Sequence, residues 1–432
     1  MPPRGLMQRH GFFGVAWCLS GPGVPRGLAK SVFSAEKHAR VGPVGGVVGG
    51  IFVPLSPDDT IKIMEKKRKA RNHAFDILCG ICIVRMVMLH IMGVTGERDQ
   101  HWWQEVMQWT YYFMSFFFFK AGYFCRSVGG GNRAYLLDRS QRLLAPYLSS
   151  GFIGLLVYFA FYFPLKSRYG HFVEDIEWSH FITTSGVYGN SPIWFLFSFF
   201  CMYILAHFTE RVRHLHWVWA LGPVISWWLW TQGNPLWLST SNVFMGIFFF
   251  YLGHLWHWAM ERWGDRRMLV VSVLLVVAAS VGNVLLPGQY AMSSNTFEGN
   301  APMAVVNATL ALCGLSGILL ATHVHRVPWL CYVGEHSMVY FLLHYPMLYF
   351  YKFTHLCFGR SIYGHPDDVI LLVPIIFSIC SWLVPYVEQL PWLSGRWGRP
   401  NPARQAAVQP AGAALAGDGE KMPAPDAAVP NK

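Results

Sequence analysis

Long apolar segments separated by short polar loops dominate the chain from residue 74 onward. Each segment is close to the roughly 20 residues that an α-helix needs to cross the hydrocarbon core of a bilayer. The pattern therefore predicts an all-α fold, a polytopic membrane bundle of about ten transmembrane helices. The predicted spans are residues 74–94, 106–124, 143–163, 192–209, 215–231, 240–259, 268–286, 302–321, 333–351 and 368–388.

The basic residues of the loops predict how these spans are oriented. Cytoplasmic loops of membrane proteins carry an excess of Lys and Arg, and here every second loop is basic. With ten spans, this alternation places both termini in the cytoplasm and predicts an integral, multi-pass protein of the plasma membrane. The basic loops hold Lys66 to Arg71, Arg126 with Arg133, Arg139 and Arg142, Arg211 with Arg213, Arg262 with Arg266 and Arg267, and Arg326.

Composition supports a membrane protein and argues against two other classes. The chain is 53% hydrophobic and only 13% charged, whereas a soluble domain carries about 25% charged residues. The net charge of +11 could suggest nucleic acid as a partner, but its basic residues lie in short loop clusters, so no nucleic acid is expected. Cys79 and Cys82 form a CxxC inside the first span, where ordinary packing is the better interpretation than redox chemistry.

Three regions follow from these patterns. Residues 1–63 are rich in Gly and Pro, and we interpret them as a disordered extension or a misassigned start, because Met64 directly precedes a basic run. Residues 64–392 form the membrane domain. Residues 393–432 are rich in Ala and Pro and predict a disordered cytoplasmic tail.

The first span carries polar residues that are costly to bury in a membrane. Asp76 and His90 are fourteen positions apart, which places them within about 40° on one face and about 21 Å apart along the axis. They share a stripe but cannot touch. Arg85 lies about 140° from His90, and we interpret it as structural. An intramembrane histidine indicates a functional site, although a hydrogen-bonded structural role for His90 is the alternative.

Basic residues near the cytoplasmic ends predict a site for an anion. Lys120 interrupts an aromatic run in the second span and either binds an anionic ligand or extends its amine to the membrane surface. Arg139 and Arg142, at i and i+3, present a phosphate-binding surface or serve only as positive-inside anchors. Gly122 is expected to permit close approach of a second helix.

Two further motifs lie on later spans. Trp194 and Phe195 open the fourth span at its external end, where aromatic rings either form the wall of a substrate cleft or pack in the core. His344 lies in the outer half of the ninth span, at a depth similar to that of His90 on the first. Two intramembrane histidines at one depth predict a shared site.

Taken as a set, these motifs resemble the acyltransferase family 3 membrane proteins, including the fucose 4-O-acetylase-like group. The resemblance covers about residues 70–390, in order and with suitable spacing. Its elements are Arg71 followed by Asp76-Ile-Leu-x-Gly80 and His90, the run from Phe117 to Gly122, Arg139-x-x-Arg142-Leu-Leu-x-Pro146, Trp194-Phe195-Leu196, and Tyr340-x-x-x-His344-x-Pro346.

The resemblance implies transfer of an acyl group, usually acetyl from acetyl-CoA, to a hydroxyl of a glycan. Acyl-CoA is then a co-substrate, with no bound cofactor and no metal. Arg139 and Arg142 would attract the CoA phosphates, with Lys120 beside them. Asp76, too far from His90 to orient it, would be a helix-start residue or lie at the donor entrance. The carbohydrate acceptor, in some cases lipid-linked, would meet Trp194 and Phe195.

The implied catalytic residues are the two histidines. His90 would act as general base on the acceptor hydroxyl. His344 would orient the acceptor or polarise the thioester carbonyl. The family often has a basic residue eleven positions before the first-span histidine, and this chain has Cys79 there. Arg85, on another face, cannot simply replace it, so Lys120 is the alternative source of positive charge.

Two other functions fit a polytopic membrane protein with buried charges. A transporter or flippase for a lipid-linked glycan would use the same charges for proton coupling or headgroup contact, but the chain shows no internal repeat. A glycan polymerase would normally need large external loops. The only external loop of appreciable length is the one predicted at residues 164–191. Membrane lipids are expected partners under every interpretation.

Overall fold

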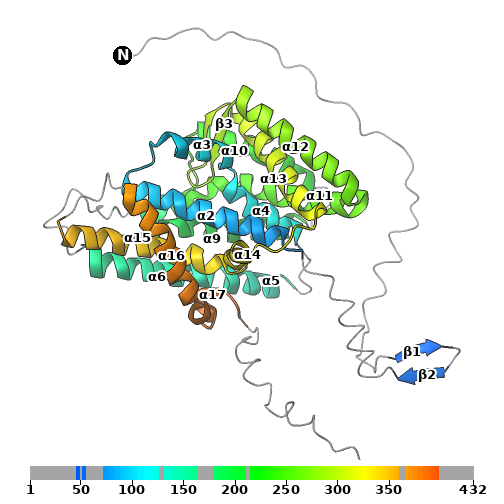
Figure 1. The fold of residues 1–432 in the computed structure, drawn as a ribbon, viewed down its shortest axis with the longest axis horizontal. Coiled ribbons are helices and arrows are strands. Elements are labelled where there is room, and N and C mark those ends of the chain that lie inside the picture. Colours follow the sequence, from blue (N-terminus) through cyan, green and yellow to red (C-terminus); the bar gives the residue numbers. More distant parts are fainter. Residues whose placement is uncertain are drawn as a thin grey trace, which may run out of the picture. The chain divides into compact units, whose positions relative to one another are not determined.

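The computed structural model describes residues 45–48, 51–54, 72–125, 131–163, 177, 179–210, 215–359 and 366–397. Two units divide at residue 71. In the first, β1 (Gly45–Val48) and β2 (Ile51–Pro54) form an antiparallel hairpin in which Val48 pairs with Ile51 (Figure 1). The remainder of the predicted extension 1–63 lies outside the described residues, as does the predicted tail beyond residue 397.

The second unit is a helical bundle with one short hairpin (Figure 1), which confirms the all-α prediction. Its strands are β3 (Gly288–Ala291) and β4 (Thr296–Gly299). Its helices are α2 (Ala74–Thr95), α3 (His101–Thr110), α4 (Phe113–Tyr123), α5 (Asn132–Arg139), η1 (Ser140–Leu144), α6 (Ala145–Val157), η2 (Tyr158–Tyr162), α8 (His180–Thr183), η5 (Ser191–Ile193), α9 (Trp194–Thr209), η6 (Leu215–Leu221), α10 (Gly222–Thr231), η7 (Trp237–Asn242), α11 (Val243–Trp263), α12 (Asp265–Leu285), α13 (Ala301–Ala321), α14 (Pro328–Glu335), α15 (Ser337–Cys357), α16 (Pro366–Val387) and α17 (Pro391–Ser394).

The predicted count of ten spans is approximate. Within the described residues, seven helices are long and apolar enough to cross a membrane by themselves. The predicted span 106–124 breaks at Tyr111 and Tyr112 into α3 and α4, and the span 333–351 breaks at His336 into α14 and α15. Each break lies inside a longer stretch rich in apolar residues, so hydropathy averaged over the span does not reveal where the helix ends. The seven are Ala74–Thr95, Asn132–Phe161, Ser191–Thr209, Trp237–Trp263, Asp265–Leu285, Ala301–Ala321 and Asp367–Val387.

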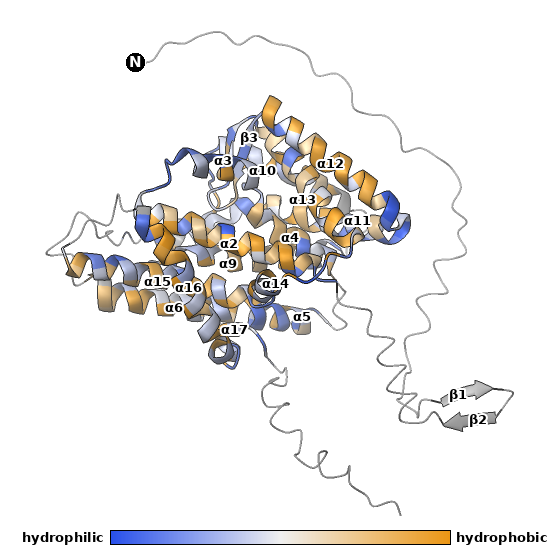
Figure 2. Cartoon of the chain, viewed as in Figure 1, coloured by the Kyte–Doolittle hydropathy of each residue, from blue (hydrophilic) through white to orange (hydrophobic). Residues whose placement is uncertain are grey.

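Apolar side chains cover the outer surface of the bundle as well as its interior. Figure 2 shows α12 as largely hydrophobic, and its exposed residues include Val270, Leu274 and Val284. A soluble helix would turn such residues toward a core, because exposing them to water is unfavourable. On this helix they form the face expected to contact lipid.

Glycines set the closest contacts between helices. A Cβ on Gly122 of α4 would meet the backbone oxygen of Phe250 in α11, and a Cβ on Gly253 would meet the backbone oxygen of Phe119. The two helices therefore pack backbone against backbone, as small residues allow in membranes. The expectation that Gly122 permits close helix approach is confirmed.

Two buried asparagines fasten the hairpin β3–β4 to the bundle: Asn242 donates to the backbone oxygen of Met292 at 3.1 Å, and Asn295 makes several bonds. Asn295 has a left-handed backbone (φ 48°), which asparagine tolerates better than most residues. Its amide donates to the backbone oxygen of Ser226 (3.0 Å) and to Asn234 Oδ1 (2.6 Å), and its oxygen accepts from the hydroxyl of Tyr290 (2.9 Å). These bonds hold the hairpin in one position.

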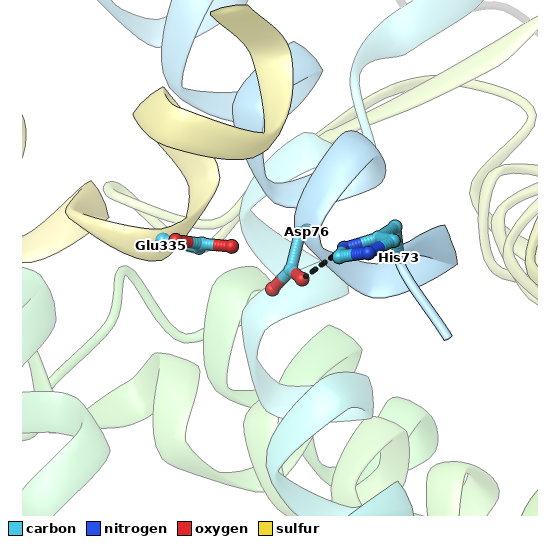
Figure 3. Close-up of side chains that lie close together, drawn as sticks. All are labelled: His73, Asp76 and Glu335. Carbon is cyan, nitrogen blue, oxygen red and sulfur yellow. Dashed lines mark ion pairs between the residues drawn. The ribbon is translucent and has the colours of Figure 1, made fainter. Parts of the chain in front are cut away.

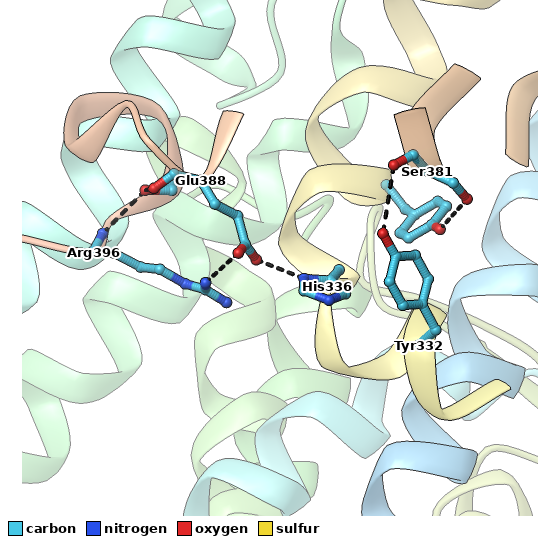
Figure 4. A network of polar contacts seen from close by, with 7 residues as sticks. Tyr332, His336, Ser381, Glu388 and Arg396 are labelled. Carbon is cyan, nitrogen blue, oxygen red and sulfur yellow. Dashed lines mark hydrogen bonds and ion pairs between the residues drawn. The ribbon is translucent and has the colours of Figure 1, made fainter. Parts of the chain in front are cut away.

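A second polar cluster joins the start of α15 to the end of α16 (Figure 4). Glu388 accepts from His336 Nδ1 at 2.6 Å and pairs with Arg396 Nη1 at 2.5 Å. Burial alone would raise the pKa of Glu388, but the hydrogen bonds and positive charges of His336 and Arg396 outweigh it, so the pKa of this carboxyl lies below its ordinary value. The break at His336 is thus secured by an ion pair.

Replacing Gly122 with Val should destabilise the contact of α4 with α11. The added side chain has no space against the Phe250 backbone, and overpacking of this kind costs about 1–3 kcal/mol. We expect the melting temperature of the detergent-purified protein to fall by several degrees. Gly131→Ser is the matched control, because a Cβ there meets nothing within 4 Å and serine is a favoured first helix cap. Equal melting temperatures for the two variants would contradict this account of the packing.

Candidate functional site

The structure brings the two predicted histidines into contact. His90 of α2 and His344 of α15 lie with ring centroids 5.2 Å apart and planes inclined by 39°. The ring of Tyr345 meets His90 edge-on at 5.1 Å. His344 is fully buried, whereas His90 is partly accessible. The pair is therefore reached from the His90 side.

Hydrogen bonds fix which nitrogen of His344 carries the proton. Nδ1 lies 2.9 Å from the backbone oxygens of both Tyr340 and Phe341. A carbonyl oxygen can only accept, so Nδ1 is the donor and Nε2 of the neutral ring holds a lone pair. Within the described part of the chain, Nε2 is buried without a hydrogen-bond partner.

This tautomer limits what His344 can do. Its Nε2 can accept a hydrogen bond from an N–H of His90 or from a hydroxyl group. A neutral ring cannot donate from Nε2, so it cannot polarise a carbonyl there. Of the two expected roles for His344, orienting the acceptor through a hydrogen bond to Nε2 is compatible with this tautomer, and polarising a carbonyl from Nε2 is not.

Pro346 explains how α15 is tied to the segment that precedes α9. Proline has no N–H, so the backbone oxygen of Leu342, four residues earlier, loses its helical partner. The amide of Asn190 donates to that oxygen at 3.1 Å, and Asn190 itself is fully buried. The motif residue Pro346 thereby positions the start of α9, where Trp194 lies.

The larger cavity gathers the predicted basic residues. It has a volume of about 640 Å³, and Lys120, Arg139 and Arg142 all line it. Most of the remaining wall is aromatic or aliphatic, with Phe117 and Phe195 among its residues, and the carboxylate Asp138 also lines it. Three cations against one carboxylate, with a largely apolar wall, suit a ligand with phosphate groups and a less polar arm.

The two arginines are held differently. Arg139 lies over the rings of Tyr203 (4.2 Å to the centroid) and Tyr135 (5.1 Å), so cation–π contacts orient it. Arg142 Nε donates to Asp138 Oδ1 at 2.7 Å. The π-helical turn η1 begins directly after Arg139, and such turns are frequent at functional sites.

The smaller cavity holds His90 and Trp194. Its volume is about 250 Å³, and Arg85, Gln104 and the hairpin residue Gln289 also line it. Phe195, expected beside Trp194 at the substrate cleft, lines the larger cavity instead. The two neighbours diverge because consecutive helical residues point about 100° apart.

The two cavities meet at Phe341, which lines both. Phe341 lies one helical turn before His344, and the order along α2 agrees: Ile83 lines the larger cavity, and Met86 and His90 line the smaller one. The histidine pair therefore borders the smaller cavity, and Phe341, one helical turn before His344, is the residue that this cavity shares with the basic one.

Asp76 belongs to a separate cluster (Figure 3). It lies in the first turn of α2, and its Oδ2 is 3.4 Å from Nδ1 of His73. His73, Asp76 and Glu335 bring one nitrogen and two oxygen ligand atoms within 4.8 Å of one another. Asp76 does not line either cavity, so it is a helix-start residue by position.

Sequence reasoning missed several residues of this site. Phe341 reads as one more apolar residue of α15, and no pattern reveals that it lines two cavities. The hairpin β3–β4 falls in a connection that hydropathy treats as a loop. Arg85, interpreted as structural, lines the cavity of His90, and Pro346 was the one signal that could have led to Asn190.

Comparison with known families gives a match over most of the chain. The model of an acyltransferase domain matches residues 72–385. Comparisons with curated proteins and with solved structures give no match. The family match offers no support for a transporter or a flippase. It covers the histidine pair and both cavities.

Proposed function

The chain belongs to this acyltransferase family and is a membrane acyltransferase, and on that premise we propose that it transfers an acyl group, acetyl in the first instance, from acyl-CoA to a hydroxyl of a glycan. The observation that carries the proposal is the contact of His90 with His344 beside the smaller cavity, which His90 lines and which shares Phe341 with the basic cavity. Such an arrangement gives each substrate its own compartment.

The donor is assigned to the larger cavity. Arg139, Arg142 and Lys120 supply positive charge for the phosphates of CoA, and guanidinium groups suit phosphate oxygens in particular. The aromatic wall at Phe117 and Phe195 offers an apolar path for the pantetheine arm. The thioester would reach the histidines past Phe341.

The acceptor is assigned to the smaller cavity. Trp194 offers a ring face on which a sugar can pack, and Gln104 and Gln289 offer amide groups for its hydroxyls. His90 lines this cavity, so an acceptor hydroxyl placed there lies beside the general base.

The reaction needs two proton transfers, one from the acceptor hydroxyl to His90 and one from His90 to the leaving sulfur. His90 removes the proton of the acceptor hydroxyl as its oxygen attacks the thioester carbonyl. The C–S bond then breaks, the new ester forms, and the CoA sulfur leaves with the proton that His90 had taken. His344 Nε2 accepts a hydrogen bond from His90 and so directs the other nitrogen of His90 toward the hydroxyl.

The proposed topology follows from the basic loops. Both termini and the larger cavity lie on the cytoplasmic side of the plasma membrane, where acyl-CoA is made. The smaller cavity lies toward the opposite side. The acceptor is then a cell-surface or exported glycan, free or lipid-linked.

Loss of His90 should abolish transfer. With acetyl-CoA radiolabelled in the acetyl group, membranes carrying the intact protein should label the envelope glycan, and His90→Ala should reduce the rate about 10²–10⁴-fold, as expected for loss of a general base. His254→Ala is the control, because His254 is an exposed histidine of α11 outside both cavities. Labelling that persists in a well-expressed His90→Ala protein would refute the proposed role.

Loss of Arg139 should weaken binding of the acyl donor and leave binding of the acceptor unchanged. We expect Arg139→Gln to raise the KM for acetyl-CoA about tenfold or more, because a charge-assisted phosphate contact contributes roughly 1.5–3 kcal/mol. Arg133→Gln is the matched control, since Arg133 is an exposed arginine of the same helix and does not line the cavity. Equal KM values for the two variants would place the phosphates elsewhere.

A further inference from the structure

Arg85 is a buried cation for which the described residues provide no carboxylate partner. It is only 6% exposed and lies in the membrane-spanning helix α2. No Asp or Glu of the described chain lies within ion-pair distance of it. A buried, unpaired charge is costly, and intramembrane arginines therefore pair with an anion or mark a ligand path.

The residues around Arg85 hold its guanidinium group in one orientation without neutralising its positive charge. Nε donates to Thr110 Oγ1 at 3.1 Å, and Nη2 lies 2.7 Å from the sulfur of Met107, a weak acceptor. The guanidinium carbon stands over the rings of Phe113 at 4.0 Å and Trp103 at 5.7 Å. These contacts orient the group before any ligand arrives.

One edge of the guanidinium remains open. Nη1 is buried and has no hydrogen-bond partner among the described residues, and Arg85 lines the same cavity as His90. An open, rigid and positively charged donor in a substrate cavity matches the oxygens of a carboxylate or a phosphate.

Arg85 reaches a different part of the cavity from the histidine pair. Its contacts lie on α3 and α4, whereas the ring of His90 contacts His344 and Tyr345 of α15. The two residues are also about 140° apart around α2. The guanidinium is therefore placed for a group remote from the reacting hydroxyl, and not for the thioester carbonyl.

We propose that Arg85 binds an anionic group of the acceptor, so that the substrate is a glycan bearing a carboxylate or a phosphate. The identity of the bound molecule as acceptor rests on the proposed function, whereas the binding itself does not. The cavity also holds Glu298, an exposed residue of β4 that pairs across the hairpin with Gln289. Its charge faces solvent and is screened there, so the buried end of the cavity keeps its positive potential.

Binding of three sugars to the purified protein, without acyl-CoA, tests the proposal. Methyl glucuronide carries a carboxylate, glucose 1-phosphate carries a phosphate, and methyl glucoside is neutral. Titration calorimetry in detergent should show at least one acidic sugar binding about tenfold or more tightly than the neutral one. The acidic sugar that binds better identifies the anion.

Arg85→Gln should remove this preference, and Arg98→Gln should keep it. Arg98 is the matched control because it is an exposed arginine just after the end of α2 and does not line the cavity. Should Arg85→Gln fail to fold, Arg85→Lys keeps the charge but loses the planar fork, and it should lower the preference severalfold. No preference in the wild type, or a preference unchanged in both Arg85 variants, would overturn the proposal.

Transfer assays separate this inference from the function on which it rests. In the assay with acetyl-CoA radiolabelled in its acetyl group, Arg85→Gln should raise the KM for the acidic sugar and leave kcat largely unchanged. A fall in kcat alone, equal for acidic and neutral sugars, would place Arg85 at the reacting carbonyl and contradict the proposal. If the wild type transfers to no sugar yet keeps its acidic preference in binding, the acyl-transfer assignment fails while the anion site stands.

Discussion

The constraint on which this structure depends is that polar groups inside a membrane must find partners within the protein. The backbone oxygen of Leu342, released by Pro346, is taken up by Asn190. The Nδ1 proton of His344 is shared by two carbonyls of its own helix. Once these groups are satisfied, the nitrogen that remains open is His344 Nε2, beside His90. Satisfying the backbone groups thus fixes the tautomer of His344 and leaves its Nε2 beside the ring of His90.

The same constraint arranges the two cavities. Arg139 and Arg142 are neutralised in part by ring faces and by Asp138, which leaves a basic compartment at one end of the histidine pair. Arg85 is held by a hydroxyl, a thioether and two rings, which orient its charge without cancelling it. Arg85 and His90 line the same cavity, so this oriented charge and the histidine pair border one space.

The fold class and much of the site could be predicted from the sequence. Apolar runs gave the helical bundle, and the depth of His90 and His344 in their spans predicted that they share a site, as the structure shows. Lys120, Arg139 and Arg142 likewise meet in one cavity. These results depend on periodicity and depth, which are local properties of the chain.

The rest depends on packing between distant segments. Three of the ten expected spans, 106–124, 215–231 and 333–351, are each divided between two helical segments, and the other seven match the long apolar helices. Trp194 and Phe195 face different cavities, although adjacent in sequence. Asp76 was expected either at the start of the first helix or at the donor entrance, and it lies in the first turn of α2 beside His73, outside both cavities. No sequence pattern in this chain shows which distant segments pack against a given face of a helix.

The central claim is that a donor in the basic cavity reaches the histidine pair from one side. The most direct measurement is a cryo-electron microscopy structure with an acetyl-CoA analogue in which a methylene group replaces the thioester sulfur. The account predicts phosphate density beside Arg139 and Arg142, with the acetyl carbonyl adjacent to His90. Phosphate density away from these arginines, or an acetyl group directed away from His90, would contradict it.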